Sequence, residues 1–191
     1  MSAPLLYFAI ASLDGYVNDA TGDFGWAMPD TELHGAVNDL ERNTGTYLYG
    51  RRMYEVMRAW DTDAVITDQP AVMADYAQIW RAADKIVYSA TLREVTTRRT
   101  QLRAAFDSDD AQRMKEAAER PISVAGPGLA AAAFRAGLVD EVNLFVVPII
   151  VGGGTRALPD GVVLRLQLAA ERRFGSGVVH LQYLNATPRP S

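Results

Sequence analysis

The sequence predicts an α/β protein whose sheet is largely parallel and carries an antiparallel edge at its C-terminal end. Short apolar runs typical of buried strands alternate with segments of helical periodicity over most of the 191 residues. The last apolar runs then follow one another without a helix between them, which is typical of antiparallel pairing. This length suits one domain with a substantial core. We expect it to span residues 1–186, followed by a disordered tail at 187–191.

In the N-terminal half, residues 5–11 form an apolar run that predicts a buried strand, and Asp14-Gly15 predicts a turn into a short apolar segment at 16–17. Carboxylates in the first turn and an apolar stripe predict a helix from Pro29 to about Arg42. A strand is expected at 46–49, and helices at 51–60 and 70–81.

In the C-terminal half, strands are expected at residues 85–88 and 122–125, and longer ones at 141–151 and 177–184. The region 93–120 is the most charged, and Ser108-Asp109-Asp110 is typical of a helix start, so a helix is expected to reach Ala118. A further helix is expected from Leu129 to Ala136, where Gly137 ends it.

The composition excludes several classes of function. The chain has no cysteine, so disulfides and thiolate metal sites are excluded, no metal is expected, and the cytoplasm is the simplest compartment. A formal charge of -4 argues against nucleic-acid and anionic-membrane partners. The N-terminal residues lack a basic region followed by a long apolar core, and no stretch is long enough to cross a bilayer. We therefore expect a small-molecule ligand.

The most informative segment is the expected strand-to-helix junction at Gly50, Arg51, Arg52 and Met53. Two cations at a helix N-terminus oppose the helix macrodipole, so unpaired they would cost stability. A bound phosphate would reverse that sign. Alternatively, both arginines lie along the surface with their charged groups in water. We favour a phosphate site because two further strand ends show a similar design.

These two junctions are the runs Ser89, Ala90, Thr91, Leu92 and Gly126, Pro127, Gly128, Leu129. All three are read as strand-to-helix turns, which open on the carboxyl edge of a parallel sheet, where ligands bind. Glycines there let backbone amides approach phosphate oxygens, although Gly-Pro-Gly is also an ordinary tight turn. Together they predict a dinucleotide with an extra phosphate. The G-x-G-x-x-G fingerprint follows none of the expected strands, so a standard dinucleotide fold is disfavoured.

Three other features are candidates for a substrate pocket. The run Gly152, Gly153, Gly154 and Thr155 follows a strand and predicts either a bulged turn or backbone that touches a ligand. Trp26 lies in the loop before the first helix, where it is either a core residue or part of a pocket. Asp14 is favoured by its spacing as a turn residue, but its place at a strand end makes it a candidate for catalysis.

Several motifs, in this order, resemble the dihydrofolate reductase-like superfamily, most closely the C-terminal reductase domain of the bifunctional riboflavin-pathway deaminase-reductase. They are Ala11 to Gly15, Gly50 to Glu55, Val87 to Ser89, Gly137 to Glu141 and Pro148 to Gly154. The resemblance covers residues 5–183. It implies a three-layer α/β/α sandwich, NADPH as hydride donor and a homodimer.

The resemblance also implies roles for the junction residues. Arg51 and Arg52 would contact cofactor phosphates, residues 89–92 the adenosine ribose and its 2'-phosphate, and residues 126–129 the pyrophosphate. Two departures stand out. Pro127 removes one amide donor from the usual glycine pair. Thr31 stands where dihydrofolate reductases have their pterin-binding carboxylate, with Asp30 and Glu32 on either side, so dihydrofolate is not the first choice of substrate.

The sequence thus predicts an NADPH-dependent reductase of a small polar heterocycle or carbonyl compound. Asp14 is the candidate for substrate orientation or proton relay, and Trp26 and residues 152–155 are expected to shape the pocket. The riboflavin-pathway reduction of 5-amino-6-(5-phosphoribosylamino)uracil is the first specific reaction to test, and it requires a second anion site. The alternatives are a homodimeric nucleotide-binding protein without turnover and a reductase of dihydrofolate.

Overall fold

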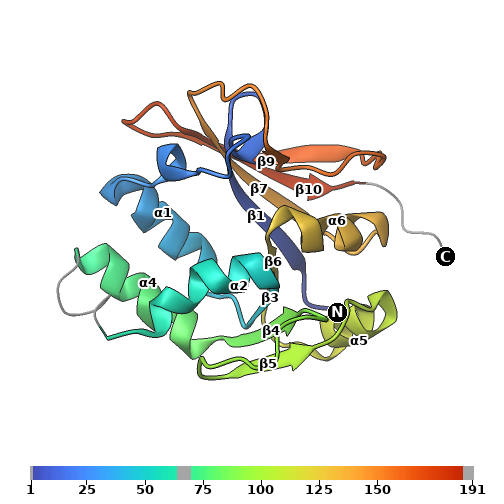
Figure 1. Ribbon diagram of the computed structural model, residues 1–191. Helices are drawn as coiled ribbons and strands as arrows, with labels where there is room; N and C mark the ends of the chain where they lie inside the picture. The colour runs from blue at the N-terminus through green and yellow to red at the C-terminus, as the bar shows by residue number, and fades with distance from the viewer. Residues whose placement is uncertain (1, 64–69, 187–191) are drawn as a thin grey trace.

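The computed structural model describes residues 2–63 and 70–186, and within them eight strands form one sheet in the order β5-β4-β3-β6-β1-β7-β10-β9 (Figure 1). Its strands are β1 (Leu5–Ser12), β3 (Thr46–Gly50), β4 (Asp84–Tyr88), β5 (Thr100–Arg103), β6 (Ile122–Ala125), β7 (Glu141–Val147), β9 (Leu166–Arg173) and β10 (Val179–Asn185). The neighbouring pairs from β5 to β7 are parallel, whereas β10 runs antiparallel to both β7 and β9. The predicted α/β class and its antiparallel C-terminal edge are confirmed.

Helices cover both faces of this sheet (Figure 1). Those on one face are α1 (Thr31–Glu41), α2 (Arg51–Met57) and α4 (Ala71–Ala82), and those on the other are α5 (Ser108–Ala117) and α6 (Pro127–Arg135). Each face has its own buried apolar cluster: Leu33, Tyr54 and Trp80 belong to the first, Ala111 and Phe134 to the second. The predicted three-layer sandwich is therefore present.

The structure corrects the sequence prediction in several places. No helix follows Ser89, because residues 89–99 form a loop that leads into β5. Neither β5 nor β9 was predicted, and β7 ends at Val147 rather than at 151. The N-cap of α5 is Asp107, whose carboxylate accepts a hydrogen bond from the Asp110 amide at 2.7 Å. The expected tail at 187–191 lies outside the described residues.

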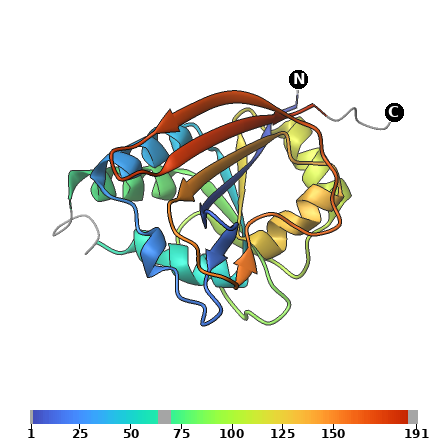
Figure 2. The same ribbon diagram turned by 90° about the horizontal axis from the view of Figure 1, so that it is seen from above.

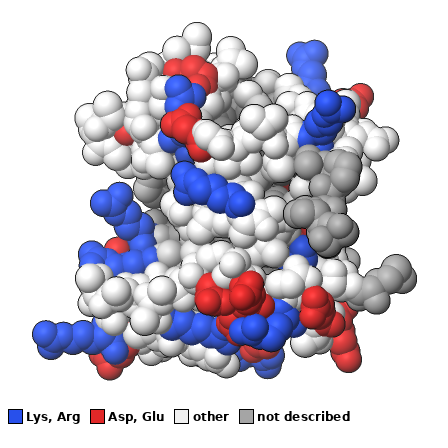
Figure 3. Space-filling model, turned by 90° about the vertical axis from the view of Figure 1, so that its right-hand side faces the viewer, with Lys and Arg blue, Asp and Glu red and all other residues white. Residues whose placement is uncertain are grey.

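Charged side chains of both signs are mixed on the side of the molecule that carries α5 and α6. Figure 3 shows acidic and basic side chains mixed most densely at the lower end of the view, near α5, with further charged side chains near the top and basic ones within the mostly uncharged middle. This agrees with the sequences of the two helices, since α5 contains acidic and basic residues whereas Arg135 is the single charged residue of α6. The described residues on this side form no extended basic patch that would attract a polyanion.

Glu41 is a buried carboxylic acid near the end of α1, with 3% of its surface exposed. Burial raises its pKa to about 7, although neighbouring hydroxyl groups, including that of Ser123 at 3.3 Å, oppose this shift. In the unfolded chain its pKa returns to the ordinary value of 4.5. The stability that the protonated side chain provides is therefore complete below that pH and is lost as pH rises towards 7.

We expect Glu41→Gln to remove this pH dependence. From pH 5 to pH 8 the free energy of unfolding of the variant should rise, relative to that of the unchanged protein, by on the order of 3 kcal/mol, because each unit of pKa shift corresponds to about 1.4 kcal/mol. Urea unfolding of both proteins at four pH values across this range measures the difference. A constant difference across the range would contradict the prediction.

Candidate functional site

The three predicted ligand junctions lie side by side at the carboxyl edge of the sheet. In the register of the parallel strands, Gly50 is paired with Tyr88 and Tyr49 with Ala125. Ser89 and Gly126 therefore follow strands on either side of the β3–α2 junction. Figure 2 shows the start of α2 at the end of the sheet to which β1 points. The structure thus brings together the residues that the sequence assigned to one ligand.

Arg51 faces the loop that follows β4. Its guanidinium donates to the Thr91 hydroxyl at 3.1 Å and to the Glu55 carboxylate at 3.0 Å. The Ser89 hydroxyl accepts from the Thr91 and Leu92 amides at 3.2 and 3.0 Å. Ser89 therefore caps free amides as at a helix start although no helix follows, and it holds Thr91 beside Arg51. The guanidinium of Arg51 and the hydroxyl groups of Ser89 and Thr91 thus lie together at this strand end. Such a set of groups suits the binding of a phosphate.

Gly126 forms a tight turn between β6 and α6 with φ of 90°. A Cβ atom there would lie 3.1 Å from Cβ of Met53, which explains why glycine is needed and places Met53 against this turn. Pro127 begins the helix, and a Cβ atom added at Gly128 would project into open space. This first turn of α6 leaves room for an anionic group beside its backbone amides.

Arg52 points away from its neighbour. It lines a groove of about 700 Å³ together with Asn18, Asp19, Ala20, Thr21, Gly22, Gly154 and Thr155. The groove thus joins one predicted cofactor residue to two predicted pocket residues. Gly152, Gly153 and Trp26 do not line it. Trp26 lies in a short 3₁₀ helix, η1 (Gly25–Ala27), and within the described residues its buried indole N–H has no hydrogen-bond partner.

One wall of this groove is formed by two paired chain segments, one following β1 and the other following β7. Strands β2 (Tyr16–Asn18) and β8 (Thr155–Arg156) pair antiparallel, as the adjacent arrows near the end of β1 in Figure 2 show. The Thr155 amide donates to the Asn18 side-chain oxygen at 2.9 Å. Gly154 has φ of 132°, and a Cβ atom there would lie 2.0 Å from the Asn18 carbonyl oxygen. Only glycine permits this approach of two backbones.

Asp14 anchors the loop that follows β7. It lies in a turn closed by the Gly15 amide and the Ser12 carbonyl at 2.9 Å, and its carboxylate accepts from the Val151 and Gly152 amides at 3.2 and 2.8 Å. The Ser12 hydroxyl, together with these amides, lowers the pKa of Asp14. The side chain is therefore a carboxylate at neutral pH, a form that can orient a ligand by accepting hydrogen bonds.

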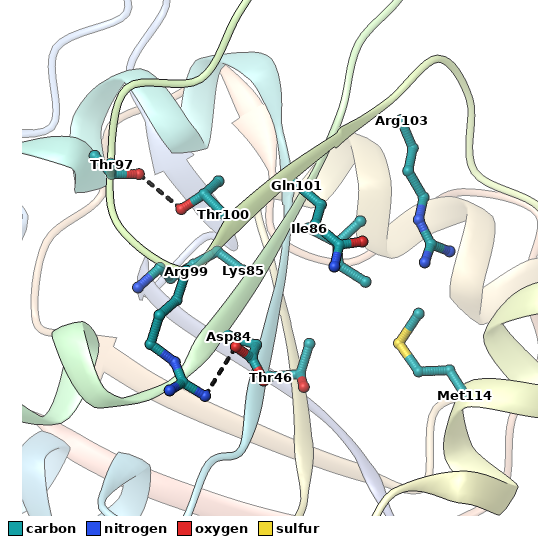
Figure 4. Close-up of a pocket in the computed structure, with 10 residues that line it drawn as sticks. All are labelled: Thr46, Asp84, Lys85, Ile86, Thr97, Arg99, Thr100, Gln101, Arg103 and Met114. Atoms are coloured by element: carbon teal, nitrogen blue, oxygen red, sulfur yellow. Dashed lines mark hydrogen bonds and ion pairs between the residues drawn. The ribbon is translucent and has the colours of Figure 1, made fainter.

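A second hollow, of about 430 Å³, lies away from this edge, along β4 and β5 (Figure 4). Its charged residues already have partners. Arg99 pairs with Asp84 at 2.9 Å, and Arg103 pairs with Asp110. Burial lowers the pKa of Lys85 to about 8, and its ammonium group donates to the carbonyls of Trp80 and Ala83, each at 3.0 Å. This hollow presents paired charges, so we do not assign it a ligand.

Sequence reasoning missed residues 18–22 as part of the site. The turn formed by Asp19 and Gly22 is a usable signal, since Asp19 accepts from the Thr21 and Asp23 amides at 2.8 and 3.0 Å. Nothing local in the sequence indicates that this turn lies beside Arg52, because the turn and α2 are far apart in the sequence and meet only in the folded chain.

With this geometry in place, the comparison with known families is decisive: the model of the RibD C-terminal domain matches residues 4–180. The chain belongs to the RibD C-terminal domain family. Among curated proteins, it is 25% identical over 178 residues to the uncharacterized protein YyaP of Bacillus subtilis (strain 168), covering 90% of this chain and 89% of that protein.

Solved structures of low sequence identity share the fold. A protein from Shewanella sp. PV-4, provisionally assigned to riboflavin biosynthesis, superposes with a TM-score of 0.72 at 19% identity over 98% of this chain and all of that one. The deaminase/5-amino-6-(5-phosphoribosylamino)uracil reductase of Thermotoga maritima superposes with a TM-score of 0.65 at 14% identity, over 97% of this chain and 57% of its own. The dihydrofolate reductase-like fold expected from the sequence is thus confirmed.

No helix within residues 2–63 and 70–186 is long and apolar enough to cross a bilayer. The same residues contain no group of three or more histidine or acidic side chains placed to hold a metal ion.

Proposed function

We propose that this RibD C-terminal domain is an NADPH-dependent reductase of a small polar heterocycle. The observation that carries the proposal is the convergence of Arg51, the Ser89–Thr91 hydroxyl groups and the Gly126 turn on one sheet edge. The Thermotoga maritima neighbour is named as a uracil reductase, which makes 5-amino-6-(5-phosphoribosylamino)uracil the first substrate to test.

The residues at this edge fit NADPH. The 3.1 Å contact places the Arg51 guanidinium beside Thr91, where it would meet the 2'-phosphate with Ser89, Ala90 and Leu92 around the ribose. Gly50, Met53 and the turn of Gly126, Pro127, Gly128 and Leu129 would border the pyrophosphate, with the open space at Gly128 in front of it. Bound NADPH supplies a hydride to the substrate; the protein binds and orients both molecules.

Dihydrofolate is a weaker candidate because the carboxylates on either side of Thr31 already have partners. Asp30 caps α1 by accepting from the Leu33 amide at 2.8 Å. Glu32 accepts from Arg172 at 3.2 Å and from the Gly175 amide at 3.0 Å. These contacts hold both carboxylates to their own surroundings, at the start of α1 and beside β9.

Calorimetric titration with NADPH and NADH tests the cofactor assignment. We expect NADPH to bind more tightly, and Arg51→Ala to weaken NADPH by about tenfold or more, since a charge-assisted hydrogen bond contributes roughly 1.5–3 kcal/mol. NADH, which lacks the 2'-phosphate, should change less. Arg113→Ala on α5 is the matched control. Failure of both nucleotides to bind would refute the reductase proposal.

The rival function is a nucleotide-binding protein without turnover. It predicts tight NADPH binding with no NADPH oxidation across a broad panel of pyrimidines, pterins and carbonyl compounds. Oxidation with any of them would exclude it.

Asp14 is our candidate for orienting the substrate or relaying a proton. Asp14→Asn should lower turnover by about tenfold or more, within the range of a general acid or base, and leave NADPH affinity unchanged. Steady-state kinetics with the uracil substrate and NADPH titration measure the two quantities. Unchanged turnover would contradict this role and show that Asp14 serves only to anchor the loop after β7.

We also propose a homodimer that uses strand β9. All eight of its residues are exposed, and Leu166 and Leu168 are 38% and 47% exposed. An exposed edge strand of this length offers unpaired backbone groups and apolar side chains to a second copy. Sedimentation equilibrium should give about twice the chain mass of 20.9 kDa. A monomer mass at micromolar concentration would contradict the proposal.

A further inference from the structure

We infer that Glu32 is a positioning residue for the substrate, because it fastens the turn between β9 and β10, residues 174–178, to the first turn of α1. This role rests on the proposed reductase function and deepens it. Asp14 and Trp26 would meet the substrate, whereas Glu32 would act on it only through the turn, which lies between the segments that carry those two residues.

Both oxygens of the Glu32 carboxylate accept hydrogen bonds from the hairpin of β9 and β10. One accepts from the Arg172 guanidinium at 3.2 Å, and the other accepts from the Gly175 amide at 3.0 Å. The Arg172 guanidinium also lies over the Phe174 ring, 4.5 Å from its centroid. Figure 2 shows the end of the red hairpin beside the blue helix α1. Glu32 thus holds the hairpin to the start of α1 at two points, both with charge-assisted hydrogen bonds.

The turn is also packed into the apolar cluster on this face of the sheet. Phe174 is 2% exposed, and its ring centroid lies 6.0 Å from that of Phe145 on β7. Leu33, the residue after Glu32, belongs to the same buried cluster, and Ile10 of β1 packs against it. The places of the turn and of the first turn of α1 therefore depend on each other and on the strands whose ends carry the candidate site.

The far side of the turn reaches the loop that follows β7. A Cβ atom at Gly177 would lie 3.4 Å from Cγ of Pro148, which is van der Waals distance. The same loop continues to Val151 and Gly152, whose amides donate to the Asp14 carboxylate. The turn therefore lies between the start of α1 and the loop that Asp14 anchors, and releasing it from Glu32 would loosen both.

The exposure of the ion pair separates this role from a contribution to overall stability. The Glu32 and Arg172 side chains are 48% and 53% exposed. Pairs as exposed as this contribute little to the stability of a whole protein. Variants of Glu32 should therefore stay folded, so that a change in how the substrate is bound can be measured on its own.

Steady-state kinetics with 5-amino-6-(5-phosphoribosylamino)uracil at saturating NADPH test the inference. We expect Glu32→Ala to raise KM for the uracil about fivefold or more, because displaced binding groups weaken substrate binding. The calorimetric Kd of NADPH should stay unchanged. Glu32→Gln keeps an oxygen that can accept from the Gly175 amide, so it should show a smaller rise. The double variant with Arg172→Ala should resemble Glu32→Ala, since both changes remove the same pair.

Asp39→Ala is the matched control on the same helix. It removes the carboxylate of an exposed pair with Arg42, 3.5 Å apart, and should leave KM unchanged.

Amide hydrogen exchange gives a second readout that needs no substrate. The Val151 and Gly152 amides should exchange about fivefold faster or more in Glu32→Ala, because their contact with Asp14 is loosened. The Asp39→Ala variant should leave their exchange rates as they are in the unchanged protein.

Where the uracil is reduced, KM decides. An unchanged KM in Glu32→Ala, or an equal loss of NADPH affinity, would overturn the inference, and a rise in Asp39→Ala of the same size would do so too. If the protein reduces no test substrate, the reductase proposal fails on its own. Hydrogen exchange then decides, since faster exchange at Val151 and Gly152 supports the positioning role and unchanged exchange refutes it.

Discussion

Replacing Gly154 with alanine is expected to destabilise the protein by more than about 2 kcal/mol, since strained backbone alone costs roughly 1–3 kcal/mol and a steric clash adds to it. With φ of 132° the backbone occupies a conformation that side chains rarely adopt, and the added Cβ would lie 2.0 Å from the Asn18 carbonyl oxygen and 2.8 Å from the Asp19 carbonyl carbon. Both are backbone atoms, so relief requires β2 and β8 to separate.

Gly153 provides the matched control for this change. It is the adjacent residue in the same loop, and no atom lies within 4 Å of the Cβ that alanine would add. Urea unfolding of both variants should show a large loss for Gly154→Ala and a loss within about 1 kcal/mol for Gly153→Ala, as for most unconstrained surface positions. Equal stability of the two variants would mean that the contact between β2 and β8 is not maintained in solution.

Replacing Asp140 with alanine is expected to cost about 3–5 kcal/mol, the range for removing one partner of a buried ion pair. The Lys115 side chain on α5 is 1% exposed, and its ammonium group lies 2.6 Å from the Asp140 carboxylate. The same carboxylate oxygen accepts from the Leu5 amide at 2.7 Å. Among the described residues, the substitution therefore leaves the buried ammonium group with the Leu138 carbonyl, at 2.7 Å, as its remaining acceptor.

Two comparisons sharpen this second test. Asp160→Ala removes the carboxylate of an exposed pair with Arg156, 3.8 Å apart, and should cost less than about 1 kcal/mol. The double variant Lys115→Met, Asp140→Leu replaces the pair by apolar side chains and should be more stable than Asp140→Ala. Thermal unfolding of all three variants measures the order of their stabilities. A double variant as unstable as Asp140→Ala would show that the unpaired ammonium group is not the cause of the loss of stability.

The sequence could predict the central strands because their side chains are buried. Leu5, Tyr7, Leu48 and Val124 are at most 1% exposed, and such apolar runs are visible without a structure. Strand β9 gave no such signal, since all its residues are exposed and no face is apolar throughout. The short β8 owes its existence to pairing with β2, which lies far away in the sequence.

The sequence wrongly predicts a helix after Ser89 because the residues there resemble those of a helix start. The Ser89 hydroxyl caps two amides, but farther along the loop tertiary contacts replace helical hydrogen bonds. The Thr96 amide donates to the Tyr54 hydroxyl at 3.0 Å, and the Arg98 amide donates to Asp61 at 3.1 Å. Propensity is overridden here by partners on α2 and in the turn that follows it.

The arginine pair shows a similar limit to what the sequence can predict about the candidate site. The run from Gly50 to Arg52 was enough to predict an anion site at this strand end. Arg51 is held by its hydrogen bond to Thr91, whereas Arg52 lines the groove beside residues 18–22. Neither of these neighbouring segments is close in the sequence, so the spacing of residues could not have indicated that the two side chains separate.

The position of β1 bears on how the chain folds during synthesis. Of the strands in this sheet, β1 is synthesised first, yet its neighbours are β6 and β7. Leu5 pairs with Ile122 and Ser12 with Val147, so neither can pair until those later residues have been made. An apolar strand that leaves the ribosome long before its partners is exposed to wrong pairing and aggregation. Chains arrested before β7 should therefore need a chaperone to stay dispersed, and completion of β7 is the step that releases them.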